Sequence, residues 1–225
     1  EGKVGIGHTR WATHGGPTDE NAHPHTDCNN EVAVVHNGIV ENFVELKQEL
    51  QEQGHVFVSE TDSECITPLI ESYLGREYGL EEAVRETAER IRGAHAVVVA
   101  SSRDPGRLVA FRLGNAGGIV VGYGEGEMYL ASDLPALLPY TKRVAYLAGG
   151  EAVSMTPEGA SYSTMDGAAV SKRPVAVPQD AVTAAKGNYK HFMLKEINEQ
   201  PEAVVNTMRG RVSFDRSTVE LDGFE

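Results

Sequence analysis

The chain has 225 residues, enough for one large domain or two small ones, and its 40% hydrophobic content supports a packed core. Its 33 acidic and 20 basic side chains give a net charge of -13, which argues against a nucleic-acid groove or an anionic membrane surface as the natural partner. The apolar runs are only as long as strands, so the sequence predicts neither a membrane span nor a signal peptide, and we expect a cytoplasmic protein.

The predicted elements of the first half alternate between strands and helices. Residues 4–9 and 31–36 have strand character, and the second run, Glu-Val-Ala-Val-Val-His, is typical of a buried strand. A helix is expected after Asn42, which has Glu45 three residues later in the pattern of a capping box. Gly54 should lie just past the end of this helix.

Two further helices are expected, over residues 61–74 and 80–91. The first contains Pro68, which should kink or interrupt it because proline lacks the N–H that an inner turn needs. The same apolar run contains Cys65, which should be buried, whereas Cys28 lies in a polar segment and should be exposed. Since the cysteines have no Cys-x-x-Cys spacing, both are expected to be reduced thiols.

Short β runs replace the helical pattern from Ala94 onward. They predict a meander-like antiparallel sheet with strands over residues 96–101, 107–112, 118–122, 128–131, 143–147, 151–155 and 160–164. Residues 168–186 are rich in Pro, Ala, Val and Ser, which is typical of an extended linker. A helix over residues 191–208, interrupted at Pro201, is expected next, and the tail from Ser213 has little to bury.

Three short motifs carry the strongest chemical signal: GHTRWATHG at residues 7–15, HNGI at residues 36–39 and SETD at residues 59–62. Arg10 offers a planar guanidinium, which can hold a carboxylate through two parallel hydrogen bonds. Asp62 offers the opposite charge, which suits an ammonium group. Together the two side chains favour an α-amino acid of the right length as the ligand.

Asn37 and Gly38 indicate an oxyanion site. During attack on a carbonyl carbon, negative charge gathers on the oxygen, and an Asn side-chain NH2 and a Gly backbone N–H about 3 Å away can stabilise it. Taken alone, each residue has a simpler interpretation: Asn-Gly is a common turn, Arg10 a surface side chain and Asp62 a helix N-cap. The capping and ammonium-binding roles of Asp62 are compatible.

The histidines at positions 8, 14, 23, 25 and 36 raise the question of a metal site. His23 and His25 are two residues apart, as in some zinc sites, but no Cys or carboxylate completes a ligand set at a recognised spacing, so we expect no metal there. The Gly-rich residues 114–126 are interpreted as hairpin turns, because no helix and no Gly-Lys-Ser/Thr ending follow them. A Gly-x-Ser-x-Gly elbow is absent too, so a serine hydrolase triad has little support.

The three motifs resemble those of the class II, N-terminal-nucleophile glutamine amidotransferases, and within them the glucosamine-6-phosphate synthase family. The resemblance covers about residues 4–202, and the string YKHFMLKEINEQP at residues 189–201 separates this family from the purine-pathway phosphoribosyl amidotransferases. It implies an α+β fold, the Ntn hydrolase-like αββα sandwich. It further implies a glutaminase domain over residues 1–167, a linker over 168–190 and a helical lead-in to a sugar isomerase domain over 191–225.

The resemblance also implies roles for individual residues. Asn37 and Gly38 would form the oxyanion hole, and the substrate-binding residues would be Arg10, Trp11, Thr13, His14 and Asp62. Trp11 would belong to the part of the pocket wall that responds to substrate and shields the route of ammonia. The parent reaction would transfer nitrogen from L-glutamine to fructose 6-phosphate, giving glucosamine 6-phosphate and glutamate, without a cofactor or metal in this half and in a homo-oligomer.

One feature departs from the family pattern. The family's nucleophile is a cysteine at the mature N-terminus, whereas residue 1 here is Glu1. We therefore expect a domain incomplete at its N-terminus that holds glutamine but does not hydrolyse it alone, and that meets fructose 6-phosphate only through the missing isomerase half. Two alternatives stay open: a glutamine-sensing or interaction module without a nucleophile, and the glutaminase domain of another class II amidotransferase.

Overall fold

The computed structural model describes residues 3–178, 189–208, 212–213 and 218–219. The chain divides into two compact units, Glu1–Val177 and Pro178–Glu225. The second unit contains helix α5 (Phe192–Met208) and the antiparallel pair β12 (Val212–Ser213) and β13 (Thr218–Val219). All three sequence motifs lie in the first unit, so this unit carries the candidate site.

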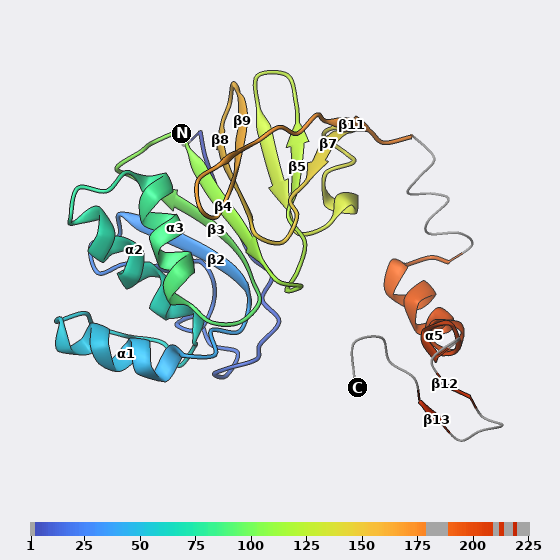
Figure 1. Ribbon diagram of the computed structural model, residues 1–225, viewed down its shortest axis with the longest axis horizontal. Helices are drawn as coiled ribbons and strands as arrows, with labels where there is room; N and C mark the ends of the chain where they lie inside the picture. The colour runs from blue at the N-terminus through green and yellow to red at the C-terminus, as the bar shows by residue number, and fades with distance from the viewer. Residues whose placement is uncertain (1–2, 179–188, 209–211, 214–217, 220–225) are drawn as a thin grey trace. The chain divides into compact units, whose positions relative to one another are not determined.

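Two antiparallel sheets form the first unit (Figure 1). The larger sheet has seven strands, in the order β1 (His25–Thr26), β2 (Val32–Gly38), β3 (His95–Ser101), β4 (Leu108–Leu113), β8 (Glu151–Thr156), β9 (Gly159–Thr164) and β10 (Ala169–Val170). The smaller sheet has four, in the order β11 (Val175–Ala176), β7 (Arg143–Tyr146), β5 (Val120–Tyr123) and β6 (Met128–Ala131). A short 3-10 turn, η2 (Leu134–Ala136), follows β6.

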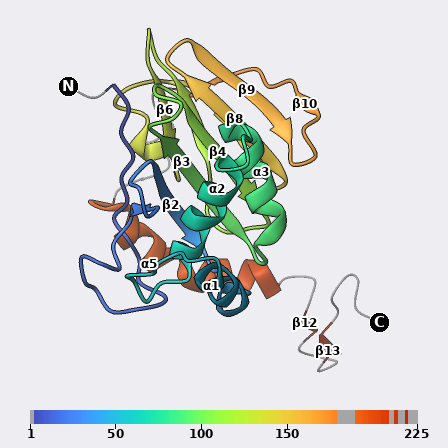
Figure 2. The same cartoon turned by 90° about the vertical axis from the view of Figure 1, so that its left-hand side faces the viewer.

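Helices α2 (Ile66–Leu74) and α3 (Leu80–Arg90) cover one face of the larger sheet, and α1 (Phe43–Glu52) packs beside residues 63–65 (Figure 2). On that face Val97 and Val99 of β3 share a core cluster with the apolar side chains of the helices. On the opposite face Ala96 and Val98 pack with residues of the smaller sheet. Because successive strand residues point to opposite faces, an almost continuous apolar strand such as β3 suits the middle of three layers.

The seven strands expected after Ala94 are confirmed, but they do not form one meander. Strands β5, β6 and β7 belong to the smaller sheet. The next strand, β8, belongs to the larger sheet, where it pairs with β4. The alternation of apolar residues identifies a strand without identifying its partner, which explains the error.

The capping box expected at the start of α1 is wrong. The side chain of Asn42 makes no capping hydrogen bond and instead spans a loop, donating from Nδ2 to the carbonyl of Arg90 (2.9 Å) and accepting from the N–H of Arg92 (2.8 Å). The long-range backbone partners satisfy both ends of the amide, so none is left for the helix. Gly54, at a φ of +95°, follows the helix end as expected.

The run over residues 61–74 is interrupted just before Pro68, whereas the helix that contains Pro201 is not interrupted. Residues 61–74 divide into a 3-10 turn, η1 (Ser63–Cys65), and helix α2, which places Pro68 in the first turn of α2. In a first turn the missing N–H has no intrahelical acceptor to lose. Helix α5 runs through Pro201, so the predicted interruption there is wrong; a proline removes one hydrogen bond of the ladder, and the turns on either side remain.

Three other segments differ from expectation. Residues 4–9 form no strand; the segment contains Gly5 and Gly7, whose backbones lack the side chains that stabilise strand pairing, and it is mostly exposed. Part of the predicted linker forms β10 and β11, which add an edge strand to each sheet. Residues 179–188 of the predicted linker and most of the tail lie outside the described residues. In the described part of the chain, no helix is both long enough and apolar enough to cross a membrane.

Candidate functional site

A cavity of about 180 Å³ lies where three segments of the first unit meet. The segments are the loop after residue 7, the end of β2 and the turn that precedes α2. The lining residues are His8, Arg10, Trp11, Thr13, His14, His23, His36, Asn37, Gly38, Thr61, Asp62 and Ser63. All seven predicted site residues are among them, so segments up to 52 residues apart in sequence enclose one space.

Gly38 sits at the end of β2 in a conformation that other residues rarely adopt. Its φ is +139°, and a Cβ at this position would lie 2.2 Å from the carbonyl oxygen of Ala94 and 2.8 Å from Nε2 of His36. Both distances are far below van der Waals contact. Glycine is therefore required here for the close approach of β2 and the segment that leads into β3.

The side chain of Asn37 is held in one orientation by His8. Nδ1 of His8 accepts a hydrogen bond from the N–H of Arg10 (2.9 Å), so in the neutral ring the proton is on Nε2. Nε2 then donates to Oδ1 of Asn37 (2.8 Å). With its oxygen engaged, Asn37 has its NH2 free, since Nδ2 makes no hydrogen bond within the described residues. The two N–H groups are available to an acceptor in the cavity.

Asp62 is a buried carboxylate beside the cavity, with 2% of its surface exposed. Oδ2 accepts a hydrogen bond from the N–H of Val40 (2.6 Å), and Oδ1 lies 3.4 Å from Nδ1 of His14. Its side chain does not cap η1, so the N-cap interpretation is wrong: Val40, far away in sequence, supplies the donor. Within the described residues no lysine or arginine pairs with Asp62.

Arg10 lines the same cavity but makes hydrogen bonds to its own loop. Nη1 donates to the carbonyl of Gly16 (2.7 Å), and Nη2 donates to the carbonyls of His14 (2.9 Å) and Gly15 (3.2 Å). Since a guanidinium has five N–H groups, two are left for a ligand. Arg10 has a φ of +48°, a region that few non-glycine residues occupy. The loop is therefore folded around the guanidinium.

The remaining predicted residues, Trp11, Thr13 and His14, line the cavity from the loop after residue 7. Trp11 is 85% exposed, and its role in shielding the route of ammonia stays a prediction. Oγ1 of Thr13 lies 3.4 Å from Nδ1 of His14, and both residues are on the outer side of the loop. His14 thus connects an exposed hydroxyl with the buried carboxylate of Asp62.

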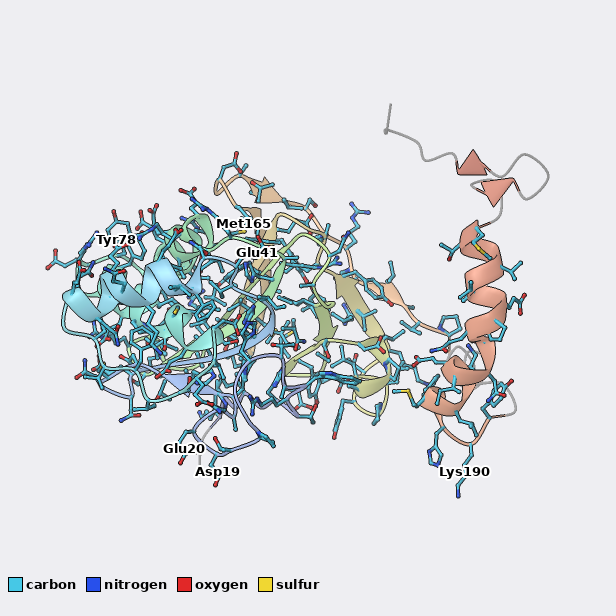
Figure 3. All side chains as sticks on the ribbon, turned by 90° about the horizontal axis from the view of Figure 1, so that it is seen from below. Asp19, Glu20, Glu41, Tyr78, Met165 and Lys190 are labelled. Atoms are coloured by element: carbon cyan, nitrogen blue, oxygen red, sulfur yellow. The ribbon has the colours of Figure 1, made fainter. Side chains whose placement is uncertain are left out.

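Asn21 ties the Arg10 loop to the Asp62 turn and was missed by the sequence reasoning. It is 3% exposed; Nδ2 donates to the carbonyl of Gly16 (3.1 Å) and Oδ1 accepts from the N–H of Glu60 (2.8 Å). At the tip of the same loop, Asp19 and Glu20 point away from the sheets (Figure 3). An amide that donates to one segment and accepts from the other fixes the separation of the two segments.

The turn itself is held by a buried carboxylate that the sequence reasoning also missed. Glu64 is 4% exposed and accepts from the N–H of Val58 (2.8 Å), the N–H of Ser59 (2.8 Å) and the hydroxyl of Ser59 (2.5 Å). Three donors compensate for the loss of hydration. Glu64 thereby fixes the backbone just before Asp62.

Four histidines in and beside the cavity, His23, His25, His36 and His95, have a lowered pKa. Burial lowers the pKa of His36 well below its usual 6.5, with the neighbouring His95 adding to the effect. Burial also lowers the pKa of His25, of His95 and, to about 3, of His23. Nε2 of His36 lies 3.0 Å from Nδ1 of His95, which is possible because neither ring is charged. The lowered pKa favours the neutral form of these four rings at pH 7.

Neither thiol is placed to attack a ligand in the cavity. Cys65 is fully buried, as predicted, its Sγ contacts the carbonyl of Phe43 (3.6 Å), and burial raises its pKa to about 12. Cys28 is exposed, as predicted, and does not line the cavity. A thiol with so high a pKa carries almost no thiolate at pH 7, so Cys65 is not a nucleophile.

Residues 8–139, more than half of the chain, match the family model described as a glutamine amidotransferase domain. The chain belongs to this glutamine amidotransferase family. The match begins at His8 and includes every residue predicted for the site.

Relatives within the amidotransferase family are close in sequence and much longer. A protein of Aquifex aeolicus named glutamine–fructose-6-phosphate aminotransferase [isomerizing] is 51% identical over 214 residues, which cover 95% of this chain and 35% of the relative. A protein of the same name from Thermus thermophilus is 50% identical over 222 residues, 98% of this chain and 36% of the relative. The chain thus spans about a third of the length of the curated relatives it matches.

A solved structure supports the fold. The glutamine phosphoribosylpyrophosphate amidotransferase of B. subtilis, complexed with ADP and GMP, superposes with a TM-score of 0.56 at 25% identity, over 70% of this chain and 34% of that chain. The mixed α/β architecture with antiparallel sheets is therefore shared with a glutamine amidotransferase.

Proposed function

We propose that this chain is the glutamine-binding part of an amidotransferase that moves the amide nitrogen of L-glutamine to fructose 6-phosphate. The observation that carries the proposal is the shared cavity, into which the motifs bring a guanidinium, a buried carboxylate and a free amide donor. The names of relatives at about 50% identity support fructose 6-phosphate as the acceptor.

Asp62 gives the proposal its electrostatic basis. A buried carboxylate is stable when a cation or several donors compensate for its lost hydration. Asp62 has one short hydrogen bond, from the N–H of Val40, and Nδ1 of His14 at 3.4 Å. The α-ammonium of glutamine would complete the set. The free N–H groups of Arg10 would hold the α-carboxylate, with Thr13 and His14 as neighbouring donors, so the two charges select an α-amino acid.

Asn37 and Gly38 would act at the other end of the substrate. When a thiolate attacks Cδ of glutamine, negative charge develops on the amide oxygen, and the Asn37 NH2 and the Gly38 N–H would stabilise it. The C–N bond breaks, ammonia leaves after taking up a proton, and water then hydrolyses the thioester to glutamate. His8 would contribute by holding Oδ1 of Asn37 away from the oxyanion.

The nucleophile of this reaction would come from a segment that precedes residue 1 in the whole protein. A second cavity, of about 260 Å³, lies between the two sheets and shares His8, His36 and Asn37 with the first. Its other walls include Val98, Ile119 and Leu130, so it suits an apolar strand that ends beside Asn37. We place the cysteine-bearing strand there, and we expect an Ntn-type αββα sandwich in the whole protein.

The second unit fits a lead-in to a further domain. Helix α5 has five large apolar side chains that are about half exposed: Met193, Leu194, Ile197, Val204 and Val205. In the proposal these side chains pack against the other two thirds of the whole protein. The sugar isomerase half and the contacts of a homo-oligomer would lie there. The domain limits at residues 167 and 190, the cytoplasmic location and the absence of nucleic-acid and membrane partners are also part of the proposal.

A purine-pathway phosphoribosyl amidotransferase is the second candidate, because the B. subtilis structure has the same fold. Its 25% identity over 70% of the chain is weaker support than 51% over 95%. A glutamine sensor without a nucleophile is the third. All three would bind glutamine at Arg10 and Asp62, so the binding site alone does not distinguish them.

The distinguishing experiment uses the whole protein from the intact reading frame. Glutamine with fructose 6-phosphate should yield glucosamine 6-phosphate and glutamate in equal amounts, and phosphoribosyl pyrophosphate should not replace the sugar phosphate. The 225-residue chain assayed alone should release no glutamate. Glutamate release by the chain alone would mean that one of its own thiols or hydroxyls attacks, which contradicts the proposed origin of the nucleophile.

A further inference from the structure

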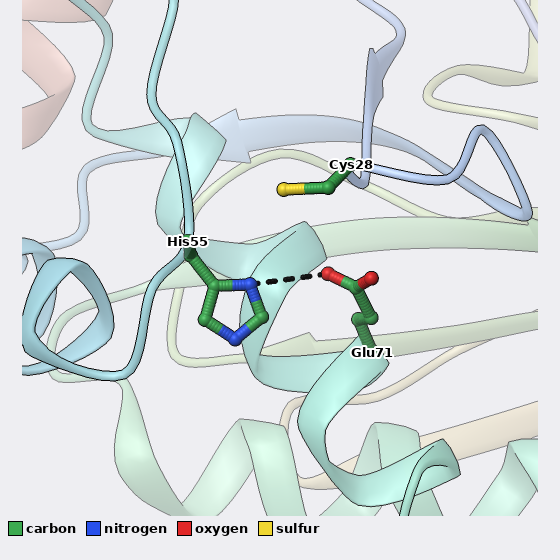
Figure 4. A group of neighbouring side chains, drawn as sticks. All are labelled: Cys28, His55 and Glu71. Atoms are coloured by element: carbon green, nitrogen blue, oxygen red, sulfur yellow. Dashed lines mark ion pairs between the residues drawn. The ribbon is translucent and has the colours of Figure 1, made fainter.

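Three potential metal ligands converge on the side of the first unit formed by β1, α1 and α2. Cys28 lies in the turn between β1 and β2, His55 follows the end of α1, and Glu71 lies in α2. One ligand atom of each residue lies within 4.8 Å of the other two. Figure 4 shows the three side chains directed toward a common point. We propose that Cys28, His55 and Glu71 form a zinc-binding site.

The distances suit a tetrahedral ion after a small adjustment. Metal–ligand distances of about 2.0–2.3 Å put neighbouring ligand atoms of a tetrahedral zinc about 3.3–3.8 Å apart. Nδ1 of His55 already lies 3.1 Å from Oε2 of Glu71. The thiol of Cys28 has somewhat farther to move, and Cys28 is an exposed turn residue, so the movement disturbs no core packing. Water would supply the fourth ligand on the exposed side.

Two further side chains orient the ligands. Nε2 of His55 lies 3.1 Å from the hydroxyl of Ser72, which fixes the ring with Nδ1 toward the other two ligands. Nδ2 of Asn29 donates to Oε1 of Glu71 (2.6 Å), which leaves Oε2 toward His55. Zinc-binding histidines and carboxylates are commonly held by such outer hydrogen bonds. The proposed site therefore includes two residues that orient the ligands, Ser72 and Asn29, in addition to the three ligands.

The ligand types favour zinc over the common hard cations. Mg²⁺ and Ca²⁺ prefer oxygen ligands, whereas a thiolate, an imidazole and a carboxylate are all regular zinc ligands. The thiolate and the carboxylate carry two negative charges that one Zn²⁺ neutralises. The ion would join the β1–β2 turn to α2 and to the segment that leads to Asp62, while leaving the glutamine cavity itself free of metal.

The test is zinc binding to the metal-free, reduced 225-residue chain, measured by competition with a chromophoric chelator. One equivalent should bind, and Cys28→Ser, His55→Gln and Glu71→Gln should each weaken the zinc Kd by about 100-fold or more. Ser72→Ala and Asn29→Ala should weaken it by about ten-fold, the usual effect of outer hydrogen bonds. The chain loaded with Co²⁺ should show a thiolate-to-cobalt charge-transfer band that Cys28→Ser abolishes.

Two control variants separate this site from other binding. Cys65→Ala removes the other thiol and His23→Gln disrupts the histidine cluster, and both should keep the zinc Kd within about two-fold of the original protein. Circular dichroism shows whether each variant is folded. Failure of the original chain to bind an equivalent of zinc would overturn the proposal. So would a Cys28→Ser variant that binds zinc as tightly as the original chain, or a His23→Gln variant that does not bind it.

Discussion

Nε2 of His8 donates a hydrogen bond to Oδ1 of Asn37 at 2.8 Å, while Nδ1 of the same ring accepts from the backbone N–H of Arg10. One imidazole therefore fixes both the amide that faces the cavity and the backbone of the arginine loop. His8 would not touch the substrate in this arrangement, so we regard it as a positioning residue for Asn37.

Replacement of His8 should lower the turnover of glutamine more than its binding. In the whole protein, His8→Ala leaves the Asn37 amide free to rotate, so we expect kcat for glutamate release to fall by about ten-fold or more, with KM changed less than about three-fold. His8→Gln retains an N–H donor and should recover part of kcat. A rise in KM alone, with kcat unchanged, would assign His8 to substrate binding instead.

Gly38→Ala should destabilise the first unit. The added Cβ would lie 2.2 Å from the carbonyl oxygen of Ala94, and alanine disfavours a φ of +139°, so we expect the free energy of unfolding to fall by about 2 kcal/mol or more. Gly54→Ala is the matched control, because Gly54 also has a positive φ but no atom within 4 Å of the added Cβ. Urea unfolding measures the free energy of unfolding of both variants. An equal decrease in the two variants would contradict the prediction, because it would show that the close contact with Ala94 does not destabilise the chain.

Asn21→Asp should separate the two segments that Asn21 connects. The aspartate can still accept from the N–H of Glu60, but it loses the donor to Gly16 and puts a second negative charge near the Glu60 carboxylate, which lies 3.4 Å from Nδ2. We expect a loss of stability of about 1–3 kcal/mol and weaker glutamine binding. Asp19→Asn, at the exposed tip of the loop, should change neither quantity. Unchanged glutamine affinity in Asn21→Asp would mean that the loop keeps its place without this tie.

The neutral histidines predict a loss of stability in mild acid. His23, His25, His36 and His95 all have a lower pKa in the folded chain than the ordinary 6.5, so the unfolded chain binds more protons once the pH falls below about 6.5. The free energy of unfolding should therefore decrease from pH 6.5 downward, toward the pKa of about 3 of His23. Urea unfolding at pH 7.5, 6.0 and 5.0 measures the slope, and His23→Gln should reduce it. A constant stability over this range would contradict the assignment of neutral rings.

Residues that interact locally were predictable from the sequence. The strands after Ala94 follow from the period of two in their apolar residues, and α3 follows from apolar residues three or four apart. The predicted burial of Cys65 followed from its place in an apolar helical run. In each case, the information lies within a single segment.

Residues that depend on distant partners were not predictable. Asn42 has the spacing of a capping box, yet its amide binds the carbonyl of Arg90 and the N–H of Arg92. His8 and Asn21 act on residues 29 and 39 positions away, and no periodic pattern indicates such pairs. The metal ligands at positions 28, 55 and 71 share no recognised spacing for the same reason. The motifs that contain Arg10, Asn37 and Asp62 were recognised by their resemblance to a family of sequences. The period of the apolar residues did not indicate them.

The pairing of Asp62 with the α-ammonium of glutamine is the central claim, and isothermal titration of glutamine into Asp62→Asn tests it most directly. The asparagine can still accept from the N–H of Val40, so the melting temperature should stay close to that of the original chain, while the missing charge should weaken the glutamine Kd by about ten-fold or more. Asp19→Asn serves as the control for removal of one negative charge. A folded Asp62→Asn chain that binds glutamine as tightly as the original would contradict the proposed site.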